Sequence, residues 1–116
     1  GLPLNWQLKQ RNGRLLEATY SSANYKLYAL AGGPPFRPGM VRVDDDGAAI
    51  EVEVWEIPSS ELGSFLTGIP APLGLGKVQL ADGRWETGFI CEPYGLDGAV
   101  DITEFGGWRA YMKSQR

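Results

Sequence analysis

Glycine and proline constrain this chain more than any other feature, because they interrupt it every few residues. Sixteen glycines and eight prolines occur among 116 residues, and they divide the chain into short segments in which apolar and polar residues alternate. This pattern is typical of short strands joined by tight turns. A chain of this length ordinarily forms one domain around one core. We therefore expect a single domain over residues 1–116.

Alternation within the segments predicts the individual strands. A hairpin is expected around Asn12-Gly13 and a second around Asp82-Gly83, because both turn pairs tolerate positive φ. In the third strand Tyr25, Leu27 and Ala29 share one face. A helix capped by serine is expected after Pro58, and another at the C-terminal end. The predicted strands cover residues 4–10, 14–20, 25–30, 40–43, 49–57, 77–81 and 84–92, and the predicted helices lie within 58–68 and 106–113.

These elements predict an α+β fold, which is a twisted mixed sheet or a small mixed β-barrel of six or seven strands with two short helices. The charges exclude some functions. Eleven basic and fourteen acidic residues give a net charge of −3, and the basic residues are scattered, so nucleic-acid binding has no support. No apolar run approaches the roughly 20 residues that a membrane-spanning helix needs.

The chain contains one cysteine, Cys91, and no histidine. A Cys–His dyad, a Ser-His-Asp triad and most zinc sites are therefore excluded within it. We expect no metal, no organic cofactor and a reducing, cytoplasmic setting. Cys91 itself is interpreted as a core residue.

Four stretches in order carry a family resemblance: GLPLNWQL at the start, YKLYAL at 25–30, IEVEVW with IPAPLGLG in the middle, and DITEFGGWRAY at 101–111. Over residues 1 to about 112 the chain resembles the C-terminal domain of allophanate hydrolase. The resemblance implies a gamma-glutamylcyclotransferase-like fold. It also implies decarboxylation of the N-carboxycarbamate that an amidase half forms from allophanate, with assembly roles in some members.

The resemblance also implies where a ligand binds. In cyclotransferases the loop after the first core strand holds a substrate carboxylate with backbone N–H groups, and the matching loop here contains Ala29, Leu30 and Gly32. Cyclotransferases use a glutamate after the central helix, whereas residues 67–70 contain no carboxylate, which argues against glutamyl cyclisation. Longer members carry a histidine shortly before the segment that matches Pro3–Asn5. Because this chain lacks it, a non-catalytic module that assembles with an amidase or with itself stays the alternative.

Decarboxylation of a small dicarboxylate leaves negative charge on nitrogen, so its site needs cations, N–H donors and a proton donor. Lys26 is a candidate to bind one carboxylate, and Tyr28 on the same strand face is a candidate proton donor. Glu53, on one face with Trp55, is a second candidate proton donor. The structural alternatives are a surface lysine beside a half-buried tyrosine and a solvated acidic strand face.

The remaining candidates are amides and one arginine. Asn5 and Gln7 alternate along the first predicted strand, so both amides are expected on one face, where they bind a ligand or satisfy buried backbone groups. Arg109 follows Gly106-Gly107 and is a candidate anion ligand. In the alternative interpretation Arg109 pairs with Asp101 and only holds the C-terminal segment in place.

Overall fold

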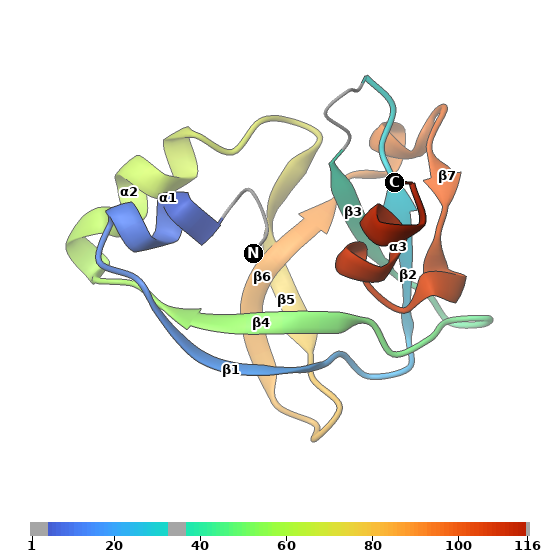
Figure 1. Ribbon diagram of the computed structural model, residues 1–116, viewed down its shortest axis with the longest axis horizontal. Helices are drawn as coiled ribbons and strands as arrows, with labels where there is room; N and C mark the ends of the chain where they lie inside the picture. The colour runs from blue at the N-terminus through green and yellow to red at the C-terminus, as the bar shows by residue number, and fades with distance from the viewer. Residues whose placement is uncertain (1–4, 33–36, 116) are drawn as a thin grey trace.

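The computed structural model describes residues 5–32 and 37–115. Ten helices and strands lie in this part of the chain, together with two 3-10 turns (Figure 1). In chain order they are α1 (Asn5–Gln10), β1 (Arg14–Tyr20), β2 (Tyr25–Ala29), β3 (Pro38–Arg42), β4 (Glu51–Glu56), α2 (Ser59–Thr67), β5 (Leu73–Gln79), β6 (Trp85–Cys91), η1 (Pro93–Leu96), β7 (Val100–Asp101), η2 (Thr103–Phe105) and α3 (Trp108–Ser114).

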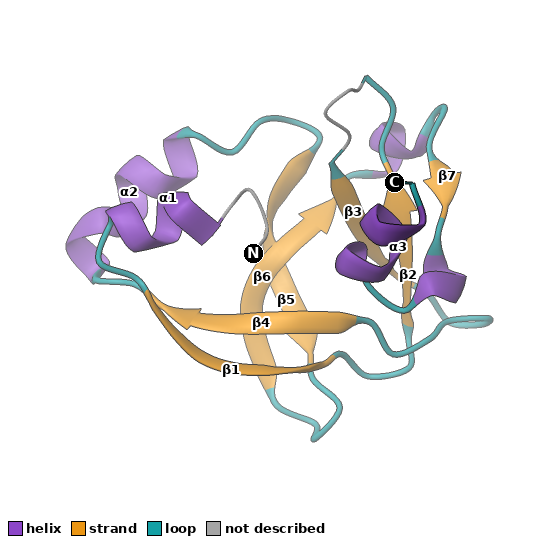
Figure 2. Cartoon of the chain, viewed as in Figure 1, coloured by secondary structure: helices purple, strands orange, loops and turns teal. Residues whose placement is uncertain are grey.

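The strands form three small sheets, so the predicted α+β class is confirmed (Figure 2). One sheet pairs β1 with β4, a second has the order β3-β2-β7, and a third pairs β5 with β6. Every pairing in the described residues is antiparallel, so the predicted mixed sheet is wrong. The predicted closed barrel is also wrong. Isolated bridges, Ser21 with Leu80 and Tyr25 with Ala48, connect the sheets where a barrel would need continuous pairing.

The first predicted hairpin is wrong, because residues 5–10 form helix α1. Asn12 adopts a positive φ of 60°, and the N–H of Gly13 donates to the carbonyl of Leu8 at 2.7 Å. The pair Asn12-Gly13 therefore ends a helix, which is the other common use of such residues. A Cβ atom on Gly13 would lie 2.7 Å from the Leu8 carbonyl oxygen, so this turn requires glycine. The partner of β1 is β4, with Arg14 opposite Glu56.

The core lies on the inner face of β2. Tyr25, Leu27 and Ala29 are all buried there, as the alternation predicts. They pack with four further buried side chains from separate elements, which are Ile50, Val78, Ile102 and Trp108. The hydroxyl of Tyr25 accepts a hydrogen bond from the backbone N–H of Gln79 at 2.9 Å, which ties β2 to the β5–β6 sheet.

The second hairpin and both helix predictions agree with the structure. β5 and β6 pair around Gly83, which has a φ of 95°, although β5 begins at Leu73, four residues before its predicted start. Helix α2 occupies residues 59–67, but Pro58 stands at its N-cap and no serine side chain caps it. The described residues contain three α-helices where the sequence predicts two, because α1 replaces a predicted strand. No helix in the described part of the chain is long and apolar enough to cross a membrane.

Candidate functional site

Glu53 lies on β4 and is held by two N–H donors. The indole Nε1–H of Trp55 donates to Glu53 Oε1 at 3.1 Å, and the guanidinium Nη2–H of Arg109 donates to Oε2 at 3.0 Å. The Glu53 side chain is only 14% exposed, whereas that of Arg109 is 52% exposed. The shared face of Glu53 and Trp55 agrees with the sequence-based prediction. The alternative pairing of Arg109 with Asp101 is wrong.

A surface hollow opens beside this carboxylate. It has a volume of about 490 Å³ and is lined by Lys9, Gly13, Arg14, Leu15, Glu53, Trp55 and Arg109. A second, water-sized cavity of about 30 Å³ lies between residues 51–53 and 108–109 and shares Glu53 and Arg109 with the hollow. Three cationic side chains and one carboxylate therefore line the larger hollow. We call it the β1–β4 hollow.

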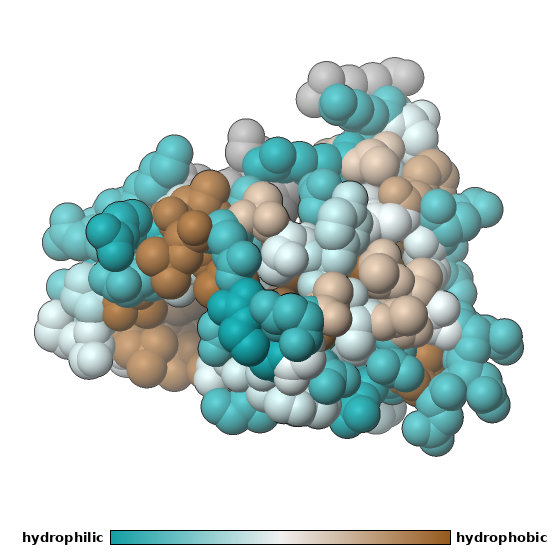
Figure 3. Space-filling view, turned by 90° about the horizontal axis from the view of Figure 1, so that it is seen from below, coloured by the Kyte–Doolittle hydropathy of each residue, from teal (hydrophilic) through white to brown (hydrophobic). Residues whose placement is uncertain are grey.

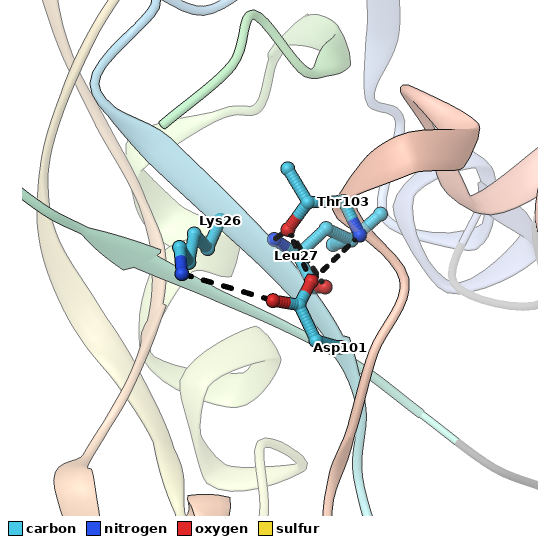
Figure 4. Close-up of polar contacts among 4 residues, drawn as sticks. All are labelled: Lys26, Leu27, Asp101 and Thr103. Carbon is cyan, nitrogen blue, oxygen red and sulfur yellow. Dashed lines mark hydrogen bonds and ion pairs between the residues drawn. The ribbon is translucent and has the colours of Figure 1, made fainter. Parts of the chain in front are cut away.

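Lys26 and Tyr28 lie on the outer face of β2. Both are half-buried and alternate with the buried Tyr25, Leu27 and Ala29, so they share a face as predicted. The Lys26 Nζ lies 3.8 Å from Asp101 Oδ2 (Figure 4). The inner face of β2 packs on Trp108, the neighbour of Arg109.

Asp101 is fixed in turn by Thr103 (Figure 4). Its Oδ1 accepts the Thr103 hydroxyl at 2.6 Å and the Thr103 backbone N–H at 2.9 Å. These two hydrogen bonds, followed by the charge of Lys26, lower the pKa of the Asp101 carboxyl. The Thr103 Oγ1 also accepts the backbone N–H of Leu27 at 3.0 Å. Sequence reasoning missed this arrangement, although Asp-x-Thr spacing is typical of such local side chain–backbone turns.

The loop after β2 begins in the core and ends at the surface. Ala29 and Leu30 are buried, whereas Gly32 is exposed with a φ of 100°. The N–H of Leu30 donates to the Arg37 carbonyl at 2.9 Å, so this group closes the loop. Residues 33–36 lie outside the described residues.

The two amide candidates lie on a helix. Asn5 and Gln7 belong to α1, so the prediction of a shared strand face is wrong. A Cβ atom on Gly68 would lie 3.9 Å from Gln7 Oε1, so the Gln7 amide lies near the end of α2. The side chain of Asn5 lies outside the described part of the chain.

The candidate residues thus fall into two groups. Glu53 and Arg109 meet at the β1–β4 hollow, while Lys26 and Tyr28 lie on the outer face of β2. Neither Lys26 nor Tyr28 lines that hollow. The Trp108 core lies on the opposite face of β2, which separates the two groups. The β1–β4 hollow therefore collects only Glu53 and Arg109 of the candidate residues.

Comparison with known proteins identifies the family. A model of the allophanate hydrolase C-terminal domain matches residues 1–113. The urea amidolyase of Saccharomyces cerevisiae is 46% identical in an alignment of 117 positions, which covers 97% of this chain and 6% of that protein. A solved Kluyveromyces lactis allophanate hydrolase is 44% identical with a TM-score of 0.95, and the match covers all of this chain and 20% of that one.

A shorter relative is also similar. The crystal structure of a protein described as specific to uropathogenic E. coli is 34% identical with a TM-score of 0.89. The match covers 97% of this chain and 87% of that one. The chain therefore spans a small fraction of the long relatives and most of a short one. By sequence and by structure, it belongs to the allophanate hydrolase C-terminal domain family.

Proposed function

We propose that this chain acts as one domain, over residues 1–116, in the cytoplasmic breakdown of urea through allophanate, and that it decarboxylates N-carboxycarbamate released by an amidase. Membership of the allophanate hydrolase C-terminal domain family supports the pathway. The urea amidolyase and allophanate hydrolase relatives support it as well. We further propose the gamma-glutamylcyclotransferase-like arrangement that the sequence resemblance implies, in which a substrate carboxylate meets the loop after β2.

The observation that carries the proposal is the environment of Lys26. The Lys26 side chain is 27% exposed, and its Nζ lies 3.8 Å from Asp101 Oδ2. Lys26 shares its strand face with Tyr28. A cation in such a partly desolvated position binds a carboxylate more strongly than one in water. The end of β2 and the exposed Gly32 in the loop that follows supply backbone further along the same segment. Asn5 and Gln7 stay candidate ligands from α1.

The proposed reaction breaks one bond. The bond between the nitrogen and one carboxylate carbon breaks, its electron pair stays on nitrogen, and carbon dioxide leaves. Lys26 holds the remaining carboxylate, and the Tyr28 hydroxyl gives a proton to the nitrogen and regains one from water. Glu53 has no step in this scheme, because both of its oxygens accept N–H hydrogen bonds at a different place in the fold.

The test supplies N-carboxycarbamate from a separate amidase and measures carbon dioxide release. The chain should accelerate release above the unaided rate, and Lys26→Gln and Tyr28→Phe should each remove at least about tenfold of the acceleration. Lys77→Gln is a matched control, because Lys77 is exposed on β5 and bonds only to Thr87 in the described structure. Equal release with and without the chain would reject the catalytic proposal.

A non-catalytic assembly module is the second candidate, and a specific surface favours it. Hydrophobic side chains gather at the end of the molecule formed by α1, α2 and the start of β1 (Figure 3). Leu15, Leu16 and Leu62 are between 41% and 51% exposed in these elements. Exposed apolar clusters mark contact surfaces. Co-sedimentation with an amidase domain tests the idea, and a strictly monomeric chain that co-sediments with no amidase would reject it.

A further inference from the structure

We propose that the β1–β4 hollow is a docking site for a short segment of a partner protein in which acidic and aliphatic residues alternate. This site is separate from the Lys26–Tyr28 face and does not depend on decarboxylation there. The charge of the hollow, its apolar flank and its size all support this site.

The charge of the hollow opposes that of the chain. Lys9, Arg14 and Arg109 line it against the single carboxylate of Glu53, whereas the whole chain carries a net charge of −3. Among the described residues Lys9 has no carboxylate within ion-pair distance. The hydrogen bond to Glu53 occupies only one of the five guanidinium N–H groups of Arg109. The hollow therefore offers cationic donors to an incoming acid.

Arg14 adds a third cation that a partner can recruit. It pairs with Glu56 at 3.2 Å, but both side chains are largely exposed. Exposed ion pairs contribute little to stability, so a ligand carboxylate can replace Glu56 at small cost. Glu53, by contrast, stays engaged by Trp55 and Arg109 and keeps the Arg109 side chain in position.

The flank of the hollow is apolar. Leu15 lines it opposite Trp55 in the β1–β4 register, and the pairing shifts between Leu15 and Glu17. This bulge leaves Leu16, which follows Leu15 but does not itself line the hollow, without a register partner, and its side chain is 51% exposed. The hydrophobic end of the molecule in Figure 3 includes the start of β1. A ligand that covers these leucines must itself present aliphatic groups.

The size of the hollow favours a peptide segment over a small anion. At about 490 Å³ it is a wide hollow open to solvent and not an enclosed pocket, which suits a segment that lies across the surface. A small dicarboxylate would use the cations alone and leave Leu15 in water. An acidic segment with aliphatic neighbours satisfies both parts of the surface.

The experiment measures binding of a dye-labelled, end-blocked peptide of alternating glutamate and leucine to the full chain by fluorescence anisotropy. We expect saturable binding that weakens as salt increases, since exposed ion pairs are screened. Lys9→Gln and Arg109→Gln should each weaken binding about fivefold, the typical effect of one exposed pair. Lys113→Gln is the matched control, because Lys113 lies on the same helix as Arg109 but outside the hollow, and it should leave the affinity for the peptide unchanged.

Four results would overturn the proposal. Equal affinity for a peptide with glutamine in place of glutamate would remove the electrostatic argument, and unchanged affinity of Lys9→Gln would remove the hollow itself. Displacement of the peptide by millimolar malonate as effectively as by unlabelled peptide would make the hollow a small-anion site. Sedimentation that shows self-association suppressed by the peptide would assign the surface to a second copy. The Lys26→Gln variant should bind the peptide with unchanged affinity, because Lys26 lies outside the hollow. Peptide binding therefore tests the docking site alone, and carbon dioxide release tests the decarboxylation proposal alone.

Discussion

Thr103→Val is the most direct test of how β2, β7 and η2 are held together. The substitution keeps the shape of the side chain and replaces its hydroxyl with a methyl group. In the structure that oxygen accepts the N–H of Leu27 at 3.0 Å and its hydroxyl donates to Asp101 at 2.6 Å. Leu27 is buried, so its N–H has no access to water once the acceptor is lost.

The expected cost follows from these contacts. An unsatisfied buried N–H lowers the free energy of unfolding by about 1–3 kcal/mol, and the loss of a hydrogen bond to an exposed carboxylate lowers it by a smaller amount. We expect a decrease of about 2 kcal/mol in the free energy of unfolding. For 116 residues the typical entropy of unfolding gives roughly 4 °C per kcal/mol, so Tm should fall by about 8 °C. Thr103→Ser, which keeps the hydroxyl, should lose less than about 1 kcal/mol.

Urea denaturation at several pH values measures both effects. Thr103 lowers the pKa of Asp101 in the folded state, so this carboxylate stabilises the fold above its unfolded pKa of about 3.9. That contribution is lost as the pH falls through the lower, folded pKa. The difference between wild type and Thr103→Val should therefore be largest above about pH 5 and should narrow in acid. Equal stability of the valine and serine variants at pH 7 would refute the reasoning.

Three further predictions concern the core. Tyr25→Phe leaves the N–H of Gln79 without its acceptor. The free energy of unfolding measured by urea denaturation should fall by about 1–2 kcal/mol, and an unchanged midpoint would contradict this. Ser21→Ala removes the acceptor of the Ile50 N–H, and this hydrogen bond is buried in the structure. The substitution should lower the free energy of unfolding by about 2 kcal/mol in the same assay. A neutral effect would imply that water replaces the hydroxyl. Burial, and to a lesser degree the charge of Glu92, raises the pKa of the Cys91 thiol, so alkylation by iodoacetamide at pH 7.5 should be much slower in the native chain than in the urea-unfolded chain.

The strands that the sequence predicts well are those in which a local pattern and the burial agree. On β2 the alternation of Tyr25, Leu27 and Ala29 identifies the core face, because one face of that strand is buried. The second hairpin is likewise visible, since Asp82-Gly83 joins two strands that pair directly. Both predictions need only neighbours within a few residues.

The first hairpin shows where local signals are ambiguous. Asn12-Gly13 suits a hairpin turn and a helix end equally, because both positions need positive or unrestricted φ. Which of the two forms depends on the partner of β1. That partner is β4, about 40 residues further along the chain, with Arg14 opposite Glu56. No pattern within residues 4–20 contains this information.

For the candidate site, the sequence by itself determined the residue types, the shared face of Lys26 and Tyr28, and the family. Only the tertiary structure decided which of these side chains meet. Glu53 and Arg109 are 56 residues apart, and the packing of α3 against β4 brings them together. Lys26 instead meets Asp101, because β2 pairs with β7. Alternation depends on the backbone of one strand, whereas these contacts depend on how separate elements pack, so no local pattern predicts them.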